Sequence, residues 1–135
     1  GFRNITNNVR PINKPEDLKG IKLRTPKGEW RVKMFQSYGA NPTPMSFSEV
    51  FTALKTGVID GQENPLAQIT SGKFQEVQKY LSMTGHVYSP AYLASSEKQW
   101  AGWSDDIKSA VRDCAVKASD FAYRRPGRRW RKADQ

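Results

Sequence analysis

The sequence predicts an α/β domain in which short strands alternate with helices and a long helix follows them. Three observations support this fold class. The 135 residues match the size of one average domain. Short apolar runs with a period of two alternate with stretches that have a helical period. Near the C-terminus, apolar residues recur at helical spacing over about five turns, beginning after Ser104.

The first part of the chain predicts one strand and one helix. Residues 1–18 are polar and are restrained by two prolines. Residues 21–24 alternate apolar with basic side chains, which predicts a half-buried strand. Residues 29–38 have apolar side chains at helical spacing, and Gly39 follows where a helix would stop.

The middle of the chain continues the alternation. Residues 41–45 contain two prolines, so we expect an extended segment. Ser46 and Glu49 have the spacing of a capping box, which predicts a helix from there to Gly57. Residues 58–61 then predict a strand that opens onto the polar segment Gln62-Glu63-Asn64-Pro65.

We expect three further elements before the long helix ends the fold. Residues 66–78 predict a helical stretch, and residues 80–83 and 87–95 predict two strands. In the long helix we expect the single cysteine, Cys114, to be a buried and unreactive part of the apolar stripe. We expect that helix to end at Pro126.

The net charge of +9 raises the possibility of a nucleic-acid-binding module. Residues 124–135 carry much of this charge, since six of them are basic and only Asp134 is acidic. The charge is therefore a property of a tail rather than of a binding face. A nucleic-acid-binding module that uses this tail, with Trp130 stacking on a base, stays open as the alternative function.

The residues give little support for catalysis. His86 is the only histidine, and a structural or solvent-facing role is its expected one. Neither a G-x-S-x-G turn nor a glycine-rich phosphate loop is present. An enzyme acting on a carboxylate would need a base close to Arg24, for which Glu49 and Glu63 are the candidates by sequence. We therefore expect a protein that is not an enzyme and that uses no cofactor or metal.

Three residues are expected to meet at one edge of the sheet. Arg24 closes a strand, Phe47 begins a helix, and Asn64 follows another strand. An arginine can hold a carboxylate by two parallel hydrogen bonds, while an asparagine and a phenylalanine would add a polar contact and an apolar wall. From the residues alone, a surface ion pair, a core position and a turn position remain the respective alternatives.

Several segments resemble the solute-binding proteins of tripartite ATP-independent periplasmic (TRAP) transporters, the DctP family. They are P-E-D-L-K-G-I-K-L-R at 15–24, G-A-N-P-T-P-M-S-F-S-E-V-F-T-A-L-K-T-G-V-I-D-G-Q-E-N-P-L at 39–66, and F-Q-E-V-Q-K-Y-L-S-M-T-G-H at 74–86. The likeness extends from Gly1 to about Tyr123. The resemblance implies one lobe, residues 1–123, of a two-lobed periplasmic binding protein, followed by a basic tail at 124–135.

The same resemblance assigns roles to four residues. It implies that Arg24 pairs with the carboxylate of an organic acid, that Asn64 contacts the same group, that Phe47 lines the pocket, and that Arg3 is a second basic contact. The implied partners are the small organic carboxylate, the permease subunits in the membrane, and an N-terminal lobe that this chain lacks. The implied compartment is the periplasm, although we expect no signal peptide and no membrane span within these residues.

Overall fold

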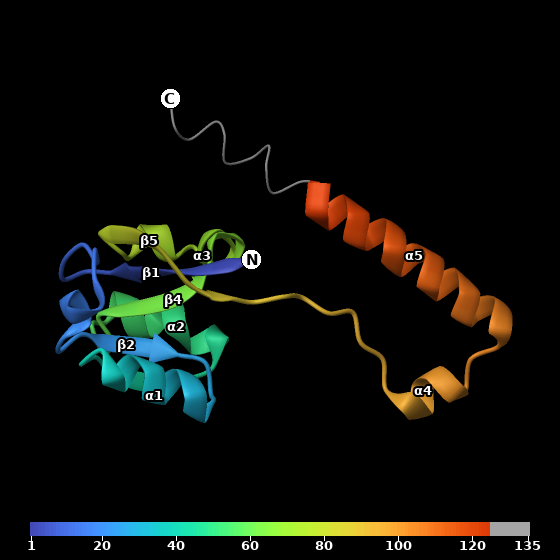
Figure 1. Cartoon of the computed structure of the whole chain (residues 1–135), viewed down its shortest axis with the longest axis horizontal. Coiled ribbons are helices and arrows are strands. Elements are labelled where there is room, and N and C mark those ends of the chain that lie inside the picture. The colour runs from blue at the N-terminus through green and yellow to red at the C-terminus, as the bar shows by residue number, and fades with distance from the viewer. Residues whose placement is uncertain (125–135) are drawn as a thin grey trace. The chain divides into compact units, whose positions relative to one another are not determined.

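A computed structural model describes residues 1–124, which fall into two compact units (Figure 1). The first unit is Gly1–Ala91, and the second begins at Tyr92. The assignment of residues 1–123 to one ligand-binding lobe, with a tail at 124–135, stays a prediction.

The first unit is built on a sheet of five strands in the order β3-β2-β4-β1-β5. Strand β2 runs parallel to both β3 and β4, whereas β1 runs antiparallel to both β4 and β5. The strands are β1 (Phe2–Asn7), β2 (Lys22–Thr25), β3 (Asn41–Pro44), β4 (Gly61–Pro65) and β5 (Tyr80–Tyr88).

This strand arrangement creates one edge at which functional residues can meet. The carboxyl ends of β2, β3 and β4 lie at the same edge as the amino end of β1. Ligands of α/β sheets bind beyond such carboxyl ends. Arg24, Asn64 and Arg3 all lie close to that edge, and Phe47 begins the helix that follows β3.

Three helices and two short 3-10 segments complete the first unit. The helices are α1 (Glu29–Ser37), α2 (Phe47–Lys55) and α3 (Leu66–Ser71), and the 3-10 segments are Pro15–Leu18 and Phe74–Glu76. The predicted capping interaction of α2 is present, because the Ser46 backbone N–H donates to the Glu49 carboxylate over 2.9 Å. This interaction fixes the point at which Phe47 enters the helix.

The register of the strands places the apolar strand residues on one face, called the apolar face although Arg3 and Glu63 also lie on it, and a set of polar residues on the other. Ile5 lies opposite Glu63, and Leu23 lies opposite Gly61. Ile5 and Leu23 pack with Phe35 of α1 in one hydrophobic cluster. The side chains on the other face are polar yet buried: Asn4, Thr6, Arg24, Gln62 and Asn64. A second cluster, built around α2 and α3, contains no residue of the five strands.

Several predicted boundaries are wrong. Strand β1 was not expected, because it has the polar sequence Phe-Arg-Asn-Ile-Thr-Asn. The strand expected at 58–61 is β4, at Gly61–Pro65, so Asn64 lies within a strand rather than after it. The helix expected to reach residue 78 ends at Ser71, before Gly72.

The two strands expected at 80–83 and 87–95 are a single strand, β5. Gly85 allows the chain to continue through a bulge, since it has a positive φ of 54° and the pairing with β1 shifts there. The Gly85 N–H donates to the Asn4 side-chain oxygen over 3.1 Å. Residues 89–95 form no strand.

The second unit contains α4 (Glu97–Ala101), which was not predicted, and α5 (Asp105–Arg124), which was. The predicted end of the last helix at Pro126 lies outside the described residues. No residue between Tyr92 and Ala122 is buried, so Cys114 is exposed and the expectation that it is buried is wrong. The apolar stripe of α5 has too few neighbours within this unit to be covered. Across residues 1–124, no helix combines the length and the hydropathy that a membrane span requires.

Candidate functional site

Arg24 is a buried guanidinium without a carboxylate partner. Its residue is 3% exposed, and Nε and Nη2 both donate to the Met45 carbonyl oxygen, over 3.0 and 2.6 Å. No ion pair within residues 1–124 includes Arg24. Burial lowers the pKa of Arg24, because removal from water disfavours the charged form. An anion bound here would offset that cost.

Arg3 already holds a carboxylate, that of Glu63. Its Nε and Nη2 donate to the two Glu63 carboxylate oxygens over 2.5 and 2.8 Å. Nη2 also donates to the Glu63 carbonyl over 2.6 Å and to the Asn64 side-chain oxygen over 3.0 Å. Of the three guanidinium nitrogens of Arg3, the third, Nη1, has no hydrogen-bond partner among the described residues. Arg3 can therefore offer a ligand the two hydrogens of Nη1 but not the fork formed by Nε and Nη2.

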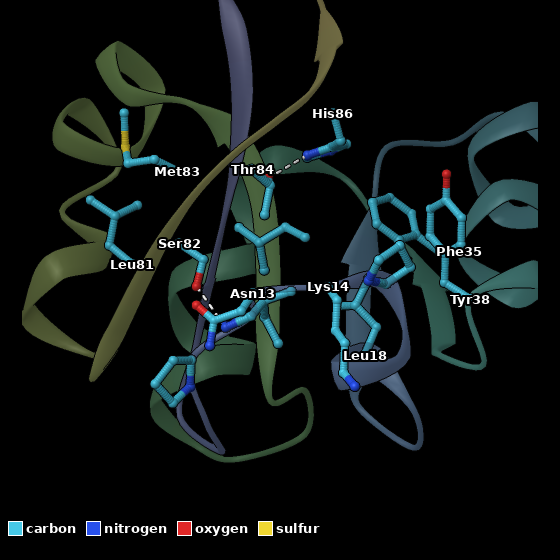
Figure 2. A pocket seen from close by; sticks show the side chains of 14 residues that line it. Asn13, Lys14, Leu18, Phe35, Tyr38, Leu81, Ser82, Met83, Thr84 and His86 are labelled. Atoms are coloured by element: carbon cyan, nitrogen blue, oxygen red, sulfur yellow. Dashed lines mark hydrogen bonds between the residues drawn. The ribbon is translucent and has the colours of Figure 1, made fainter.

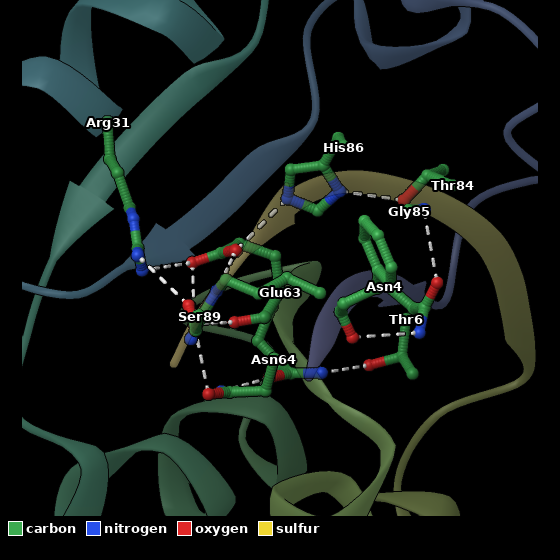
Figure 3. Close-up of polar contacts among 12 residues, drawn as sticks. Asn4, Thr6, Arg31, Glu63, Asn64, Thr84, Gly85, His86 and Ser89 are labelled. Atoms are coloured by element: carbon green, nitrogen blue, oxygen red, sulfur yellow. Dashed lines mark hydrogen bonds and ion pairs between the residues drawn. The ribbon is translucent and has the colours of Figure 1, made fainter. Parts of the chain in front are cut away.

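Glu63 is the centre of a polar cluster (Figure 3). Its side chain is fully buried, and Arg31 of α1 and His86 of β5 approach it to 3.3 and 3.1 Å. Burial alone would raise the pKa of Glu63. Hydrogen bonds from His86 and Arg3, together with the charges of Arg3 and Arg31, outweigh burial, so the pKa lies below its ordinary value.

His86 connects the Glu63 cluster to the hydrophobic cluster that contains Phe35. Its Nε2 lies against Glu63, its Nδ1 is 2.7 Å from the Thr84 hydroxyl oxygen, and its ring packs edge-on against Phe35. From the sequence, His86 is expected to be structural or solvent-facing, Glu63 is considered only as a candidate base near Arg24, and Arg31 is assigned no role. The available signal was the run Gln62-Glu63-Asn64, three polar residues that continue directly from a predicted strand.

The amide of Asn64 is held at both ends, and the residue is 4% exposed. Its Nδ2 donates to the Gln62 side-chain oxygen over 2.6 Å, and its Oδ1 accepts from Arg3. Asn64 and Arg24 share the polar face on adjacent strands, because Arg24 lies opposite Gln62, two residues before Asn64. The turn position that remained open for Asn64 is therefore excluded.

Phe47 is the first residue of α2 and is 43% exposed. Its ring lies 5.5 Å from that of the buried Phe74, measured between centroids. Phe74 supports one side of the Phe47 ring and leaves the rest accessible. This placement excludes a fully buried core position and is suited to an apolar wall.

Neither candidate base is available for proton transfer. Glu49 accepts the hydrogen bond that caps α2, and Glu63 is bonded to Arg3 and has a lowered pKa. Within the described residues, no group of three or more histidine, cysteine, aspartate or glutamate side chains could hold a metal ion. This edge of the sheet therefore presents hydrogen-bond donors held in place by their neighbours.

A separate cavity of about 540 Å³ lies beside β5, against the apolar face (Figure 2). It is lined by residues of the 11–15 segment, α1 and β5, including Phe35, Ser82 and Met83. None of Arg3, Arg24, Phe47 and Asn64 lines it. Of the residues discussed above, His86 is the one that touches both this cavity and the Glu63 cluster.

Comparisons with known proteins relate the chain to one family of solute-binding proteins. Residues 1–129 match the family described as bacterial extracellular solute-binding protein, family 7 (DctP). Solute-binding protein RD1_1052 of Roseobacter denitrificans is 50% identical over 121 residues, which is 90% of this chain. The sialic acid-binding periplasmic protein SiaP of Vibrio cholerae is 46% identical over 120 residues, 89% of this chain.

Solved structures agree with the sequence relatives. A TRAP periplasmic solute-binding protein from Polaromonas sp JS666, bound to D-erythronate, superimposes with a TM-score of 0.88 at 46% identity over 93% of this chain. The structure of RD1_1052 with bound L-galactonate gives a TM-score of 0.84. The chain spans 37% of the length of both RD1_1052 and SiaP, and 41% of the Polaromonas chain.

Proposed function

Because the chain belongs to bacterial extracellular solute-binding protein family 7, we propose that it captures a sugar acid by its carboxylate as part of a TRAP transporter. The α/β fold predicted from the sequence is that of the solved lobes in this family. The ligand, its delivery to a membrane permease and the extracytoplasmic location are parts of this proposal.

The observation that carries the proposal is the unneutralised Arg24. Glu63 neutralises Arg3 and is also approached by Arg31, but no carboxylate pairs with Arg24 among the described residues. A ligand carboxylate could accept from Arg24, from the second hydrogen on the Asn64 Nδ2 and from the Arg3 Nη1. Charge-assisted hydrogen bonds of this kind are roughly twice as strong as neutral ones.

The sugar-acid class comes from the solved relatives. Their bound molecules include D-erythronate, β-D-galacturonate and L-galactonate, each a hydroxylated monocarboxylate. One unpaired arginine suits one carboxylate, and Phe47 offers an apolar surface against which the carbon chain of such a ligand could pack. We propose this class over dicarboxylates.

The remaining parts of the proposal concern partners. Family members bind their ligand between two lobes that close around it, and the chain would supply the lobe that holds the carboxylate. The opposite lobe would contact the hydroxyl groups of the ligand and so distinguish one sugar acid from another. The proposed function includes no bond-breaking step, because the site presents hydrogen-bond donors while Glu49 and Glu63, the two candidate bases, are already bonded.

The test is titration of the ¹⁵N-labelled chain with L-galactonate, followed by NMR, which detects the weak binding expected of one lobe. The native chain is compared with Arg24→Lys and with Arg112→Lys, the same exchange in the second unit. Arg24→Lys loses the geometry of the fork and should weaken binding about tenfold to a hundredfold. Arg112→Lys should leave it unchanged.

Two further ligands make the test specific. Galactitol has the hydroxyl groups of galactonate without its carboxylate, and succinate has two carboxylates without hydroxyl groups. Galactonate should bind more tightly than either. Equal affinity of the native and Arg24→Lys chains for galactonate would refute the assignment of Arg24, and tighter binding of succinate would refute the sugar-acid class.

A further inference from the structure

We propose that Thr6, Gln62 and Gln78 are positioning residues that fix Asn64 as a hydrogen-bond donor toward the ligand. At that point the site then favours a ligand group that accepts a hydrogen bond, such as an ionised carboxylate. This proposal rests on the proposed function for its ligand. The arrangement of the three residues rests on the hydrogen bonds alone.

The residues form one continuous chain of hydrogen bonds. The Asn64 amide donates to Gln62 over 2.6 Å, Gln62 donates to the Thr6 hydroxyl over 2.8 Å, and Thr6 donates to the Gln78 side-chain oxygen over 2.9 Å. The Gln78 amide donates in turn to the carbonyl oxygens of Asp60 and Val77 over 3.3 and 3.2 Å. We call this series the Gln78–Asn64 relay.

Both ends of the relay impose the same direction. At one end Arg3 can only donate, so the Asn64 atom that faces it must be the oxygen. At the other end two backbone carbonyls can only accept, so the Gln78 atom that faces them must be the nitrogen. The Thr6 hydroxyl accepts a hydrogen bond from Gln62 and donates one to Gln78, so all the hydrogen bonds of the relay run from donor to acceptor in the same direction.

Burial makes a reversed direction costly. Thr6, Gln62 and Asn64 are 3%, 0% and 4% exposed, so water cannot replace a broken bond between them. Turning the Asn64 amide over would place its N–H groups against Arg3 and its oxygen against the Gln62 oxygen. Two buried pairs would then repel, and each unsatisfied buried group costs free energy.

The consequence is selectivity at one point of the site. The Asn64 oxygen faces Arg3, from which it accepts a hydrogen bond, and one Nδ2 hydrogen is donated to Gln62. The second Nδ2 hydrogen is what Asn64 can offer a ligand. A carboxylate oxygen can accept it, whereas the N–H group of a carboxamide would meet another donor.

The experiment compares Thr6→Val, which removes the hydroxyl but keeps the shape, with Thr6→Ser, which keeps the hydroxyl. Thr70→Val is the matched control, since the Thr70 hydroxyl is exposed on α3 and bonds only to the Leu66 carbonyl. Two quantities are measured on the ¹⁵N-labelled chain: solvent exchange of the Asn64 side-chain amide protons, and the dissociation constants of L-galactonate and L-galactonamide.

In Thr6→Val we expect the Asn64 amide protons to exchange about tenfold faster and galactonate to bind about threefold to tenfold more weakly. The preference for galactonate over galactonamide should fall by a similar factor. Thr6→Ser and Thr70→Val should stay within about twofold of the native chain on each measure. Rescue by serine separates a role in positioning from a general effect of packing.

If Thr6→Val does not fold, Gln78→Met replaces it, because Gln78 is only partly buried and its side-chain length is retained. Unchanged Asn64 exchange in a folded relay variant overturns the relay. If the native chain binds no galactonate, the proposed ligand class fails, while the exchange measurement still decides whether the relay exists.

Discussion

At the scale of single residues, the candidate site contains two buried charged groups, Glu63 and Arg24, that differ in whether an opposite charge pairs with them. Glu63 is surrounded by Arg3, Arg31 and His86, whereas within residues 1–124 Arg24 donates to the Met45 carbonyl oxygen and pairs with no carboxylate. A buried charge without an opposite charge is costly and is retained where it has a use. The contrast is the reason for placing the ligand carboxylate at Arg24 rather than at Arg3.

The lowered pKa of Glu63 makes stability depend on pH in a defined direction. Because its folded-state pKa lies below the unfolded value of about 4.5, ionised Glu63 stabilises the fold fully above that value. The contribution is lost as pH falls below about 4.5 and through the folded-state pKa. Glu63→Gln should lower the free energy of unfolding at pH 7 by about 3 kcal/mol, because Arg3 loses its buried counter-charge.

Urea denaturation of the native chain and of Glu63→Gln between pH 3 and pH 7 measures this effect. The difference between the two proteins should be largest near pH 7 and should shrink at the acid end. Glu76→Gln, the same exchange at an exposed position, is the control and should change stability by less than about 0.5 kcal/mol. A difference that stays constant across this pH range would contradict the ionised state assigned to Glu63.

Sequence reasoning reached some site residues and missed others for a physical reason. Arg24 and Phe47 stand where a strand ends and a helix begins, so local patterns place them correctly. Glu63, Arg31 and His86 meet only through tertiary packing, and of the three only Glu63 has a local signal, the polar run in which it stands. The roles of Arg3, Arg24, Phe47 and Asn64 as ligand contacts stay predictions.

At the scale of elements, helices were predicted more reliably than strands. Helix α2 has a capping box and an apolar face, and α5 has a long apolar stripe, so local sequence determines both. Strands β1 and β4 bury polar side chains on both faces of the sheet. Their sequences therefore lack the apolar alternation that identifies a strand, and pairing with each other and with the neighbouring strands satisfies their polar groups.

The close approach of β1 and β4 depends on Gly61. A Cβ atom at this position would collide with the Thr6 carbonyl oxygen and with Asn7, which leaves no room for alanine. We expect Gly61→Ala to lower the free energy of unfolding by about 1–3 kcal/mol through separation of the two strands. Urea denaturation of the variant measures the loss.

The control for this substitution is Gly102→Ala, at a glycine with ordinary φ and only normal van der Waals neighbours for an added Cβ. It should be neutral or slightly stabilising, by up to about 1 kcal/mol. If Gly61→Ala were as stable as the native chain, the inferred tight packing between β1 and β4 would be wrong.

At the scale of the whole molecule, the two compact units differ in kind. The first contains two hydrophobic clusters, whereas no residue from Tyr92 to Ala122 in the second is buried. The chain spans about two fifths of the length of its relatives, so contacts made by the rest of such a protein are outside this comparison. The fold class could be predicted from the sequence, but the division at Ala91 could not, because no change in composition marks it.

The basic tail provides a test of the alternative function. The comparisons favour solute binding and give no support to nucleic-acid binding. Deleting residues 124–135 should leave the galactonate dissociation constant within about twofold, because Arg24 and Asn64 lie in the first unit. Any binding to single-stranded DNA should fall steeply with salt and disappear with the deletion. Loss of galactonate binding on deletion would show that the tail contributes to the carboxylate site.

The pairing of Arg3 with Glu63 spans 60 positions of the chain. These groups come together only when β1 has paired with β4, so an unfolded chain has no binding site to offer. Folding and the proposed capture of a sugar acid are therefore linked equilibria. At a ligand concentration one hundred times the dissociation constant, the folded state gains about 2.7 kcal/mol. A plentiful nutrient would thus protect its own receptor from unfolding and proteolysis, and scarcity would shorten the receptor's lifetime.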